Sequence, residues 1–266
     1  MKQSSFTLIE LIIVVSIIAF LIAIFAPVLQ SSRRQANAVL CGSNIKQLVS
    51  GLLMYENQNL TLPFNFDNTP MVPPPGGYPG YGQYDRKGWW WFNSIEGFYK
   101  KSDMKITVVQ CPSKWLTDTK LKNNILCGNY GVNRSICKSS DDRQNNREEF
   151  VGMPLSTRDI PNSGKTLLIV DSGYAMISWW HTVDIPPVAL GNTVIEDTAY
   201  IPGLEINKSR NLWLGQEQDA ISGRHPNKTV NVGFVDGHVG RTKADDLFVE
   251  KISDSYKNKT PLWVPK

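Results

Sequence analysis

The chain has 266 residues, of which 41% are hydrophobic, and its 28 lysine and arginine residues exceed its 24 acidic residues to give a formal net charge of +4. This small excess is spread along the chain and forms no basic cluster, so we expect no nucleic-acid partner. Apart from an apolar N-terminal segment, about 235 residues remain, which is enough for one globular head or two small ones.

The apolar segment covers residues 6–29 and contains an 18-residue stretch, Leu11 to Val28, without a charged side chain. Such a stretch is long enough to span a bilayer and longer than the apolar core of a secretory signal. Thirteen of its residues are Leu, Ile, Val or Phe. Together they favour insertion by about 4 to 8 kcal/mol, whereas one carboxylate costs about 3 kcal/mol at mid-bilayer. We therefore expect one membrane-spanning helix.

Two other interpretations of the N-terminus are weaker. A conventional signal peptide needs small residues at its cleavage site, but the best candidate, Ala23–Ala26, has a bulky residue three positions before the cut and Pro27 directly after it. A plain membrane anchor has a different difficulty, which is orientation. Arg33 and Arg34 follow the span and only Lys2 precedes it, so the positive-inside rule alone places the head in the cytoplasm.

Glu10 is the ionisable residue within the apolar segment, and a charge at that depth is a candidate functional group that needs a partner. The residues around it, Phe6-Thr7-Leu8-Ile9-Glu10 after a short polar leader, resemble the processing site of type IV prepilins and type II secretion pseudopilins. The resemblance implies cleavage between Ser5 and Phe6 by a prepilin peptidase and methylation of the new Phe6 amino terminus. It also implies that Glu10 neutralises the terminal amine of a neighbouring subunit during assembly. Ser5 departs from the glycine that the family usually has at this position.

The same resemblance implies the partners and the location of the protein. Pro27 stands where many of these proteins have a helix-kinking proline. The expected partners are other pilin or pseudopilin subunits, the prepilin peptidase, an assembly platform in the bacterial inner membrane, and the lipid bilayer. The head is expected on the periplasmic or extracellular side, first as a single-pass membrane protein and then in a filament.

Beyond Pro27 the sequence predicts that the helix continues. Apolar residues recur there at steps of three and four, which is one face of an amphipathic helix: Ala38, Cys41, Ile45, Leu48, Leu52 and Tyr55. A helix from residue 6 to about residue 57 is about 78 Å long. After it, residues 166–170 (TLLIV) predict a buried strand.

We therefore predict an α+β, pilin-like fold. Residues 1–5 are a leader, residues 6–29 form the transmembrane half of a long helix, and residues 30–57 form its amphipathic half. That half packs on a mainly antiparallel β-sheet head, which comprises residues 58–266.

Aromatic residues in the head leave a second function open. Residues 70–84 are rich in Pro, Gly and Tyr and predict an exposed loop, and a tryptophan row, Trp89–Trp91, follows. An exposed row of this kind could bind a glycan or a protein, which would make the chain a membrane-tethered extracytoplasmic binding head. The alternative is that the tryptophans belong to a short helix buried against the head.

The four cysteines, Cys41, Cys111, Cys127 and Cys137, are candidates for two disulfides in an exported protein. Three connectivities are possible, and the sequence does not choose between them. No pair has the CxxC spacing of common zinc sites, so we expect no metal site built on cysteine.

The C-terminal part contains a hairpin signal at residues 224–242. Val230, Val232 and Phe234 alternate with other residues ahead of Asp236-Gly237, a strong signal for a two-residue turn. This stretch resembles the H-X9-DG segment of large-headed prepilin-like proteins, although ten residues separate the histidine from the aspartate here. Other head segments resemble the same proteins: Trp91, Cys111-Pro112, Tyr130–Asn133 and Val170-Asp171-Ser172.

His225, Asp236 and His238 are the candidate metal ligands of the sequence, because imidazole and carboxylate suit divalent metals. The expected turn explains Asp236 by backbone geometry alone, so we expect no metal and no other cofactor. Nothing else in the sequence resembles a set of nucleophile, base and orienting residue, so we expect a protein that is not an enzyme.

Overall fold

The computed structural model describes residues 7–74, 77–78, 87–99, 108–140, 149–184, 199–253 and 255–264. Ser5 and Phe6, and with them the expected cleavage site, lie outside these residues. So do residues 75–76 and 79–84 of the Pro-, Gly- and Tyr-rich segment.

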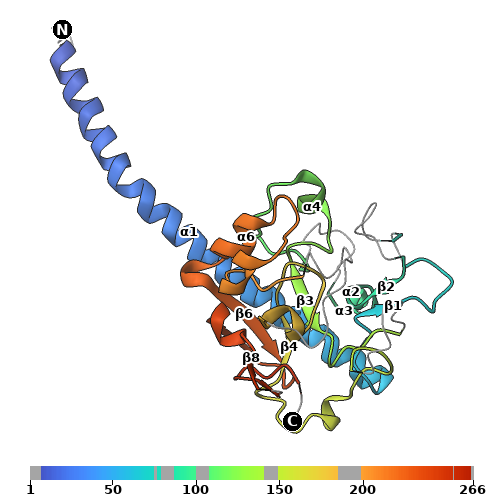
Figure 1. Ribbon diagram of the computed structural model, residues 1–266. Coiled ribbons are helices and arrows are strands. Elements are labelled where there is room, and N and C mark those ends of the chain that lie inside the picture. Colours follow the sequence, from blue (N-terminus) through green and yellow to red (C-terminus); the bar gives the residue numbers. More distant parts are fainter. Residues whose placement is uncertain are drawn as a thin grey trace.

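A single long helix, α1 (Leu8–Asn59), leads into a head, and its N-terminal part extends away from that head (Figure 1). It has 52 residues, is continuous through Pro27, and ends two residues later than expected. The terminating residue is Leu60, whose left-handed backbone (φ 70°) lets its N–H donate to the Glu56 carbonyl. The predicted α+β architecture is confirmed.

The head is built on a five-stranded mixed sheet with the strand order β5-β3-β4-β6-β7. Its strands are β3 (Tyr130–Asn133), β4 (Leu167–Asp171), β5 (Met176–Ile177), β6 (Thr229–Phe234) and β7 (Val239–Lys243). Neighbours pair antiparallel except β3 with β5. All five residues of the central strand β4 are buried, as its apolar run predicts.

Smaller elements surround the sheet. Two short antiparallel pairs are β1 (Phe66–Asp67) with β2 (Trp89–Trp90), and β8 (Glu250–Ile252) with β9 (Ser255–Lys257). The short α-helices are α2 (Trp91–Ser94), α3 (Glu96–Tyr99), α4 (Thr119–Asn123) and α6 (Glu217–Ser222). The 3-10 helices are Thr157–Asp159, Trp179–Thr182, Glu205–Ser209, Pro226–Lys228 and Ala244–Leu247.

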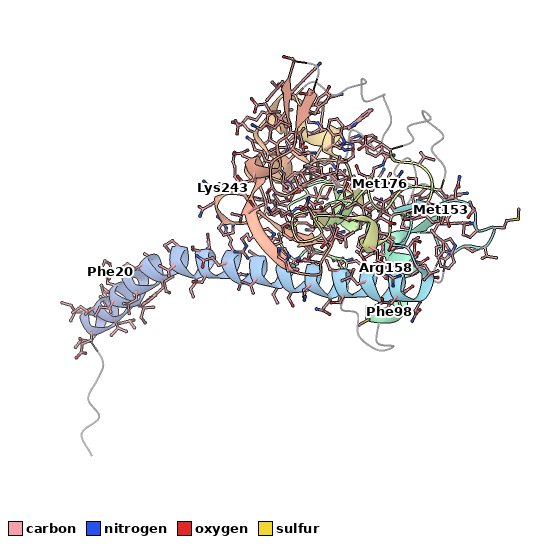
Figure 2. All side chains as sticks on the ribbon, turned by 90° about the horizontal axis from the view of Figure 1, so that it is seen from below. Phe20, Phe98, Met153, Arg158, Met176 and Lys243 are labelled. Atoms are coloured by element: carbon pink, nitrogen blue, oxygen red, sulfur yellow. The ribbon has the colours of Figure 1, made fainter. Side chains whose placement is uncertain are left out.

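The C-terminal half of α1 lies against β4, β6 and β7, and the head covers one side of it (Figure 2). The predicted apolar face is confirmed from Ala38 to Leu52, and Tyr55 is half-buried at its end. Gly233 of β6 permits the close approach, because a Cβ atom there would lie 2.5 Å from Val49 Cγ2 and 2.9 Å from Ile45 Cγ2.

The hairpin between β6 and β7 turns differently from the sequence prediction. Phe234 N–H donates to the His238 carbonyl and Gly237 N–H to the Phe234 carbonyl, so three residues form the loop instead of two. Gly237 occupies the left-handed position (φ 94°) that such three-residue loops require. The Asp-Gly pair signalled the hairpin, but the extra residue, Val235, is buried and is held by a hydrogen bond from its N–H to the Thr166 carbonyl.

Candidate functional site

The N-terminus of α1 is closed by a capping box between Thr7 and Glu10. The Thr7 N–H and hydroxyl donate to Glu10 Oε2 at 2.8 and 2.7 Å, and the Glu10 N–H donates to Thr7 Oγ1 at 3.4 Å. In the sequence, Glu10 stands out only as a charge that needs a partner. The structure shows that Glu10 also has a local role, which the spacing Thr-x-x-Glu could have revealed.

Every side chain of α1 from Leu8 to Ala36 is exposed, and most of those before Gln30 are large and apolar. Among the described residues, α1 is the one helix long and apolar enough to cross a membrane, and its most apolar window buries nothing within the molecule. A surface of this kind is stable only in lipid or against other apolar helices.

Polar contacts fix α1 to the head along its C-terminal half. Lys46 Nζ donates to the Gly237 carbonyl at 2.8 Å, at the hairpin loop. Asn231 Nδ2 donates to the Ala38 carbonyl at 3.2 Å. Near the end of the helix, Glu56 Oε1 accepts hydrogen bonds from residues of the 3-10 helix Thr157–Asp159 and its cap.

Four buried side chains from separate parts of the chain meet between α1 and the sheet: Cys41, Cys111, Asp171 and His225. We call them the four-residue cluster. One ligand atom from each residue lies within 4.8 Å of those of all the others, and the two sulfurs are 2.8 Å apart. His225 Nε2 is 3.1 Å from Asp171 Oδ2.

Neighbouring opposite charges stabilise the charged forms of Asp171 and His225 in the four-residue cluster. Burial alone raises the pKa of Asp171, but the neighbouring His225 and Arg224 outweigh this effect and leave its pKa below the ordinary value. Burial lowers the pKa of His225, and Asp171 outweighs it in turn and raises the pKa to about 9. Burial raises the pKa of the Cys111 thiol well above its usual range. A buried thiol of this kind is not a reactive nucleophile, so the grouping of thiol, imidazole and carboxylate does not resemble a cysteine hydrolase site.

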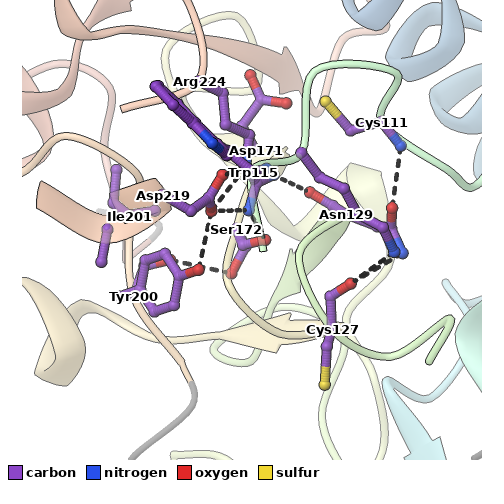
Figure 3. Close-up of polar contacts among 12 residues, drawn as sticks. Cys111, Trp115, Cys127, Asn129, Asp171, Ser172, Tyr200, Ile201, Asp219 and Arg224 are labelled. Atoms are coloured by element: carbon purple, nitrogen blue, oxygen red, sulfur yellow. Dashed lines mark hydrogen bonds and ion pairs between the residues drawn. The ribbon is translucent and has the colours of Figure 1, made fainter. Parts of the chain in front are cut away.

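A buried ion pair lies beside the cluster (Figure 3). Arg224 Nε is 2.9 Å from both carboxylate oxygens of Asp219, and both side chains are fully buried. The guanidinium also donates to the carbonyls of Asn129 and Ser172 at 2.7 Å, and the Tyr200 hydroxyl donates to Asp219 Oδ2 at 2.8 Å. Burial opposes the charge of Arg224, but Asp219 outweighs it and raises the pKa of Arg224 well above its ordinary value.

A groove of about 900 Å³ separates the middle of α1 from the head. Its described lining contains no carboxylate, and its basic residues are Arg33, Arg34, Lys114, Arg224, His225 and Lys228. Burial, followed by the nearby Arg224 charge, lowers the pKa of Lys114 to about 8. His225 therefore belongs both to the lining of this basic groove and to the four-residue cluster.

The sequence-predicted metal ligands do not form one group. Asp236 and His238 contact each other at the exposed hairpin loop, where their side-chain atoms are 2.6 Å apart. His225 lies at the other end of the six-residue strand β6, which is roughly 17 Å long. Its close partners, Asp171 and Cys111, were not among the predicted ligands, because they come from distant segments without a recognisable spacing.

The remaining predicted residues have the following surroundings. Cys41 and Cys111 lie next to each other. Cys127 is buried opposite Tyr174 at an isolated bridge, and Cys137 is buried after β3.

In the tryptophan row, Trp90 and Trp91 are buried, and Trp89 is half-buried with its indole N–H bonded to the Val72 carbonyl at 2.9 Å. The tryptophan row therefore offers no exposed stacking platform.

An exposed apolar helix in front of an α+β head defines a membrane-anchored protein with an N-terminal span. Residues 1–26 match the family model described as the prokaryotic N-terminal methylation motif. No curated protein and no solved structure matches the chain. Together, the motif and the long apolar helix support a type IV pilin-like protein, for which the motif implies processing by a prepilin peptidase and assembly with other pilin subunits. The motif suggests a structural subunit.

Proposed function

We propose that this chain is a filament subunit of a type II secretion pseudopilus or a type IV pilus-like filament. It is cleaved between Ser5 and Phe6 and methylated on Phe6, and it is held in the inner membrane with its head on the outer side. An assembly platform then moves it from lipid into the filament. The observation that supports this most directly is the division of α1, because residues 8–36 bury nothing in the molecule whereas the rest of the helix is packed on the head.

Glu10 is the residue that we expect to direct assembly. A helix surface that moves from lipid into a filament core stays in an apolar environment, so the free-energy cost of this transfer is small. A lone carboxylate in that environment is costly unless a cation lies beside it. The methylated amine of a neighbouring Phe6 supplies this cation, and the capping box holds the carboxylate at the N-terminal end of α1, where that amine can approach it.

The test separates the charge of Glu10 from its capping role. Glu10→Gln keeps a side-chain acceptor for Thr7 but removes the charge, so we expect normal membrane insertion and processing together with at least a tenfold loss of filament incorporation. Thr7→Ala removes the capping hydroxyl and keeps the charge, so we expect incorporation close to that of the wild type. Incorporation is measured as the fraction of subunit in sheared or purified filaments relative to the membrane pool.

Mass spectrometry of the membrane pool provides the control. It should show a chain that begins at an N-methylated Phe6 in the wild type and in both variants. An unprocessed chain that begins at Met1 in the wild type would contradict the proposed processing. Normal incorporation of Glu10→Gln would contradict charge pairing, and loss of incorporation in Thr7→Ala alone would assign Glu10 a capping role only.

A further inference from the structure

The four-residue cluster is assembled from segments that are far apart in the chain. Cys41 belongs to α1, Asp171 ends β4, His225 precedes the 3-10 helix before β6, and Cys111 lies in a connecting segment. All four side chains are buried. The two thiols belong to the hydrophobic core. A carboxylate and an imidazole buried beside them are costly unless they are paired or bind a ligand, so the cluster requires a physical explanation.

Hydrogen bonds orient Asp171 and leave one of its oxygens available. Oδ2 accepts from the Asn231 backbone N–H at 2.7 Å and from Asn231 Nδ2 at 3.2 Å, and it also contacts His225. Among the described residues, Asp171 Oδ1 has no hydrogen-bond partner, although it is buried. A carboxylate that is fixed through one oxygen and free at the other is typical of a metal ligand held by surrounding hydrogen bonds.

His225 has the same arrangement. Because Asp171 Oδ2 can only accept, His225 Nε2 carries a proton in their 3.1 Å contact. Nδ1 is therefore the ring nitrogen left for a metal ion, which on binding displaces the proton that Nδ1 holds in the charged ring. Within the described part of the chain, His225 Nδ1 has no hydrogen-bond partner either. A histidine that donates one N–H to a carboxylate and keeps the other nitrogen free is the usual state of a metal-bound imidazole.

We propose that Cys41, Cys111, Asp171 and His225 bind one zinc(II) ion, which connects α1 to the head. Two sulfurs, one nitrogen and one oxygen match the ligand types and the four-coordinate geometry of zinc. Thiolates disfavour calcium and magnesium, which take oxygen ligands. Binding releases the two thiol protons and the Nδ1 proton of the charged His225 ring, and the ion supplies the positive charge that stabilises buried thiolates.

The cluster needs only a small rearrangement to hold the ion. Tetrahedral zinc with Zn–S bonds of about 2.3 Å separates two sulfur ligands by about 3.8 Å. The present separation of the Cys41 and Cys111 sulfurs is 2.8 Å, so the two side chains must move apart by about 1 Å. His225 and Pro112, the neighbour of Cys111, line the basic groove, which places the cluster next to solvent and gives the ion a route of access.

The chemical competitor is a disulfide between Cys41 and Cys111, which would also connect α1 to the head. It leaves the free atoms of Asp171 and His225 unexplained, because a disulfide has no N–H or O–H to donate and no positive charge. A zinc ion satisfies all four residues at once. This inference is independent of the proposed function, since a tethered head and a filament subunit would both use the same structural ion.

The test uses the full chain, purified in detergent without chelator or reductant. Elemental analysis should give one zinc per chain, or one equivalent taken up from a zinc-buffered solution, and thiol titration after denaturation should find all four cysteines reduced. Cys111→Ser should lower zinc occupancy at least tenfold at limiting zinc. The matched control is Cys127→Ser, which removes another buried cysteine outside the cluster and should keep one zinc per chain.

Cobalt replacement in the unaltered chain keeps the test valid if Cys111→Ser does not fold. Tetrahedral cobalt(II) with two thiolate ligands gives sulfur-to-cobalt charge-transfer absorption and intense visible bands, and we expect both. A Cys41–Cys111 disulfide in a non-reducing peptide map would overturn the proposal. Four free thiols without zinc uptake, stoichiometric iron or copper in place of zinc, or octahedral cobalt would also overturn it.

Discussion

Glu56 is a single residue that holds the end of α1 against the head. Its Oε1 accepts hydrogen bonds from the Thr157 N–H at 2.6 Å, the Ser156 hydroxyl at 2.8 Å and the Thr157 hydroxyl at 2.9 Å. The side chain is 8% exposed, so water replaces these bonds poorly if they are lost. The carboxylate acts as an additional cap for the 3-10 helix Thr157–Asp159, and it comes from a residue about 100 positions earlier in the chain.

We predict that Glu56→Ala lowers the free energy of unfolding by about 2 to 3 kcal/mol, because three partly buried donors lose a buried charged acceptor. Glu56→Gln keeps a carbonyl oxygen at the same place and should lose about 1 kcal/mol. Denaturant unfolding of both variants beside the wild type measures the difference. Equal losses for alanine and glutamine would show that the charge, and not the acceptor geometry, is what matters.

At the level of elements, the contact between α1 and β6 depends on the absence of a side chain at Gly233. A Cβ atom there would meet Val49 Cγ2 at 2.5 Å, Ile169 Cγ2 at 2.8 Å and Ile45 Cγ2 at 2.9 Å. All three neighbours are fully buried, so none can move freely into solvent. The distance between helix and sheet is therefore set by the contact of the Val49 and Ile45 side chains with the bare backbone of Gly233.

We predict that Gly233→Ala destabilises the protein by about 1 to 3 kcal/mol through overpacking. Adding Val49→Ala, which removes the closest methyl group, should make the double variant less destabilised than the sum of the two single variants. The control is Gly97→Ala in α3, where an added Cβ meets no atom within 4 Å and should change stability by less than about 1 kcal/mol. Strict additivity of Gly233→Ala and Val49→Ala would contradict the proposed close contact.

The whole molecule has two parts with different solvents. The exposed apolar part of α1 requires an apolar environment, whereas the head, with the remainder of α1, buries its own hydrophobic core (Figure 1). One continuous helix joins the two parts, and the contacts of Asn231, Lys46 and Glu56 fix it to the head.

We predict that a chain beginning at Gln30 is soluble and monomeric and keeps the stability of the head, because residues before Ala36 bury no side chain. Its Tm should lie within about 4 °C of that of the full chain, which is roughly the shift that 1 kcal/mol causes in a domain of this size. Circular dichroism and size-exclusion chromatography measure both properties. A chain beginning at Lys46 is the control and should not fold stably, since it lacks the core residues Ala38, Cys41 and Ile45.

The sequence by itself determined the features that depend on neighbouring residues. An unbroken apolar segment specifies a membrane span, and apolar residues at steps of three and four specify the buried face from Ala38 to Leu52. The β6–β7 hairpin was signalled by Asp236-Gly237, although burial of Val235 lengthened the turn. These signals lie in residues that are close together in the sequence, so the elements that they specify can be predicted without knowledge of the fold.

Only the tertiary structure decided which distant residues meet. Cys41, Cys111, Asp171 and His225 share no sequence period. They come together because α1, which carries Cys41, packs against β4, which ends at Asp171, and against β6, which His225 precedes. A connecting segment brings Cys111 to the same place. The same reason separates His225 from Asp236 and His238, which the sequence suggested as one group. Contacts between residues that are far apart in the sequence depend on the packing of the whole core, so no local pattern of residues predicts them.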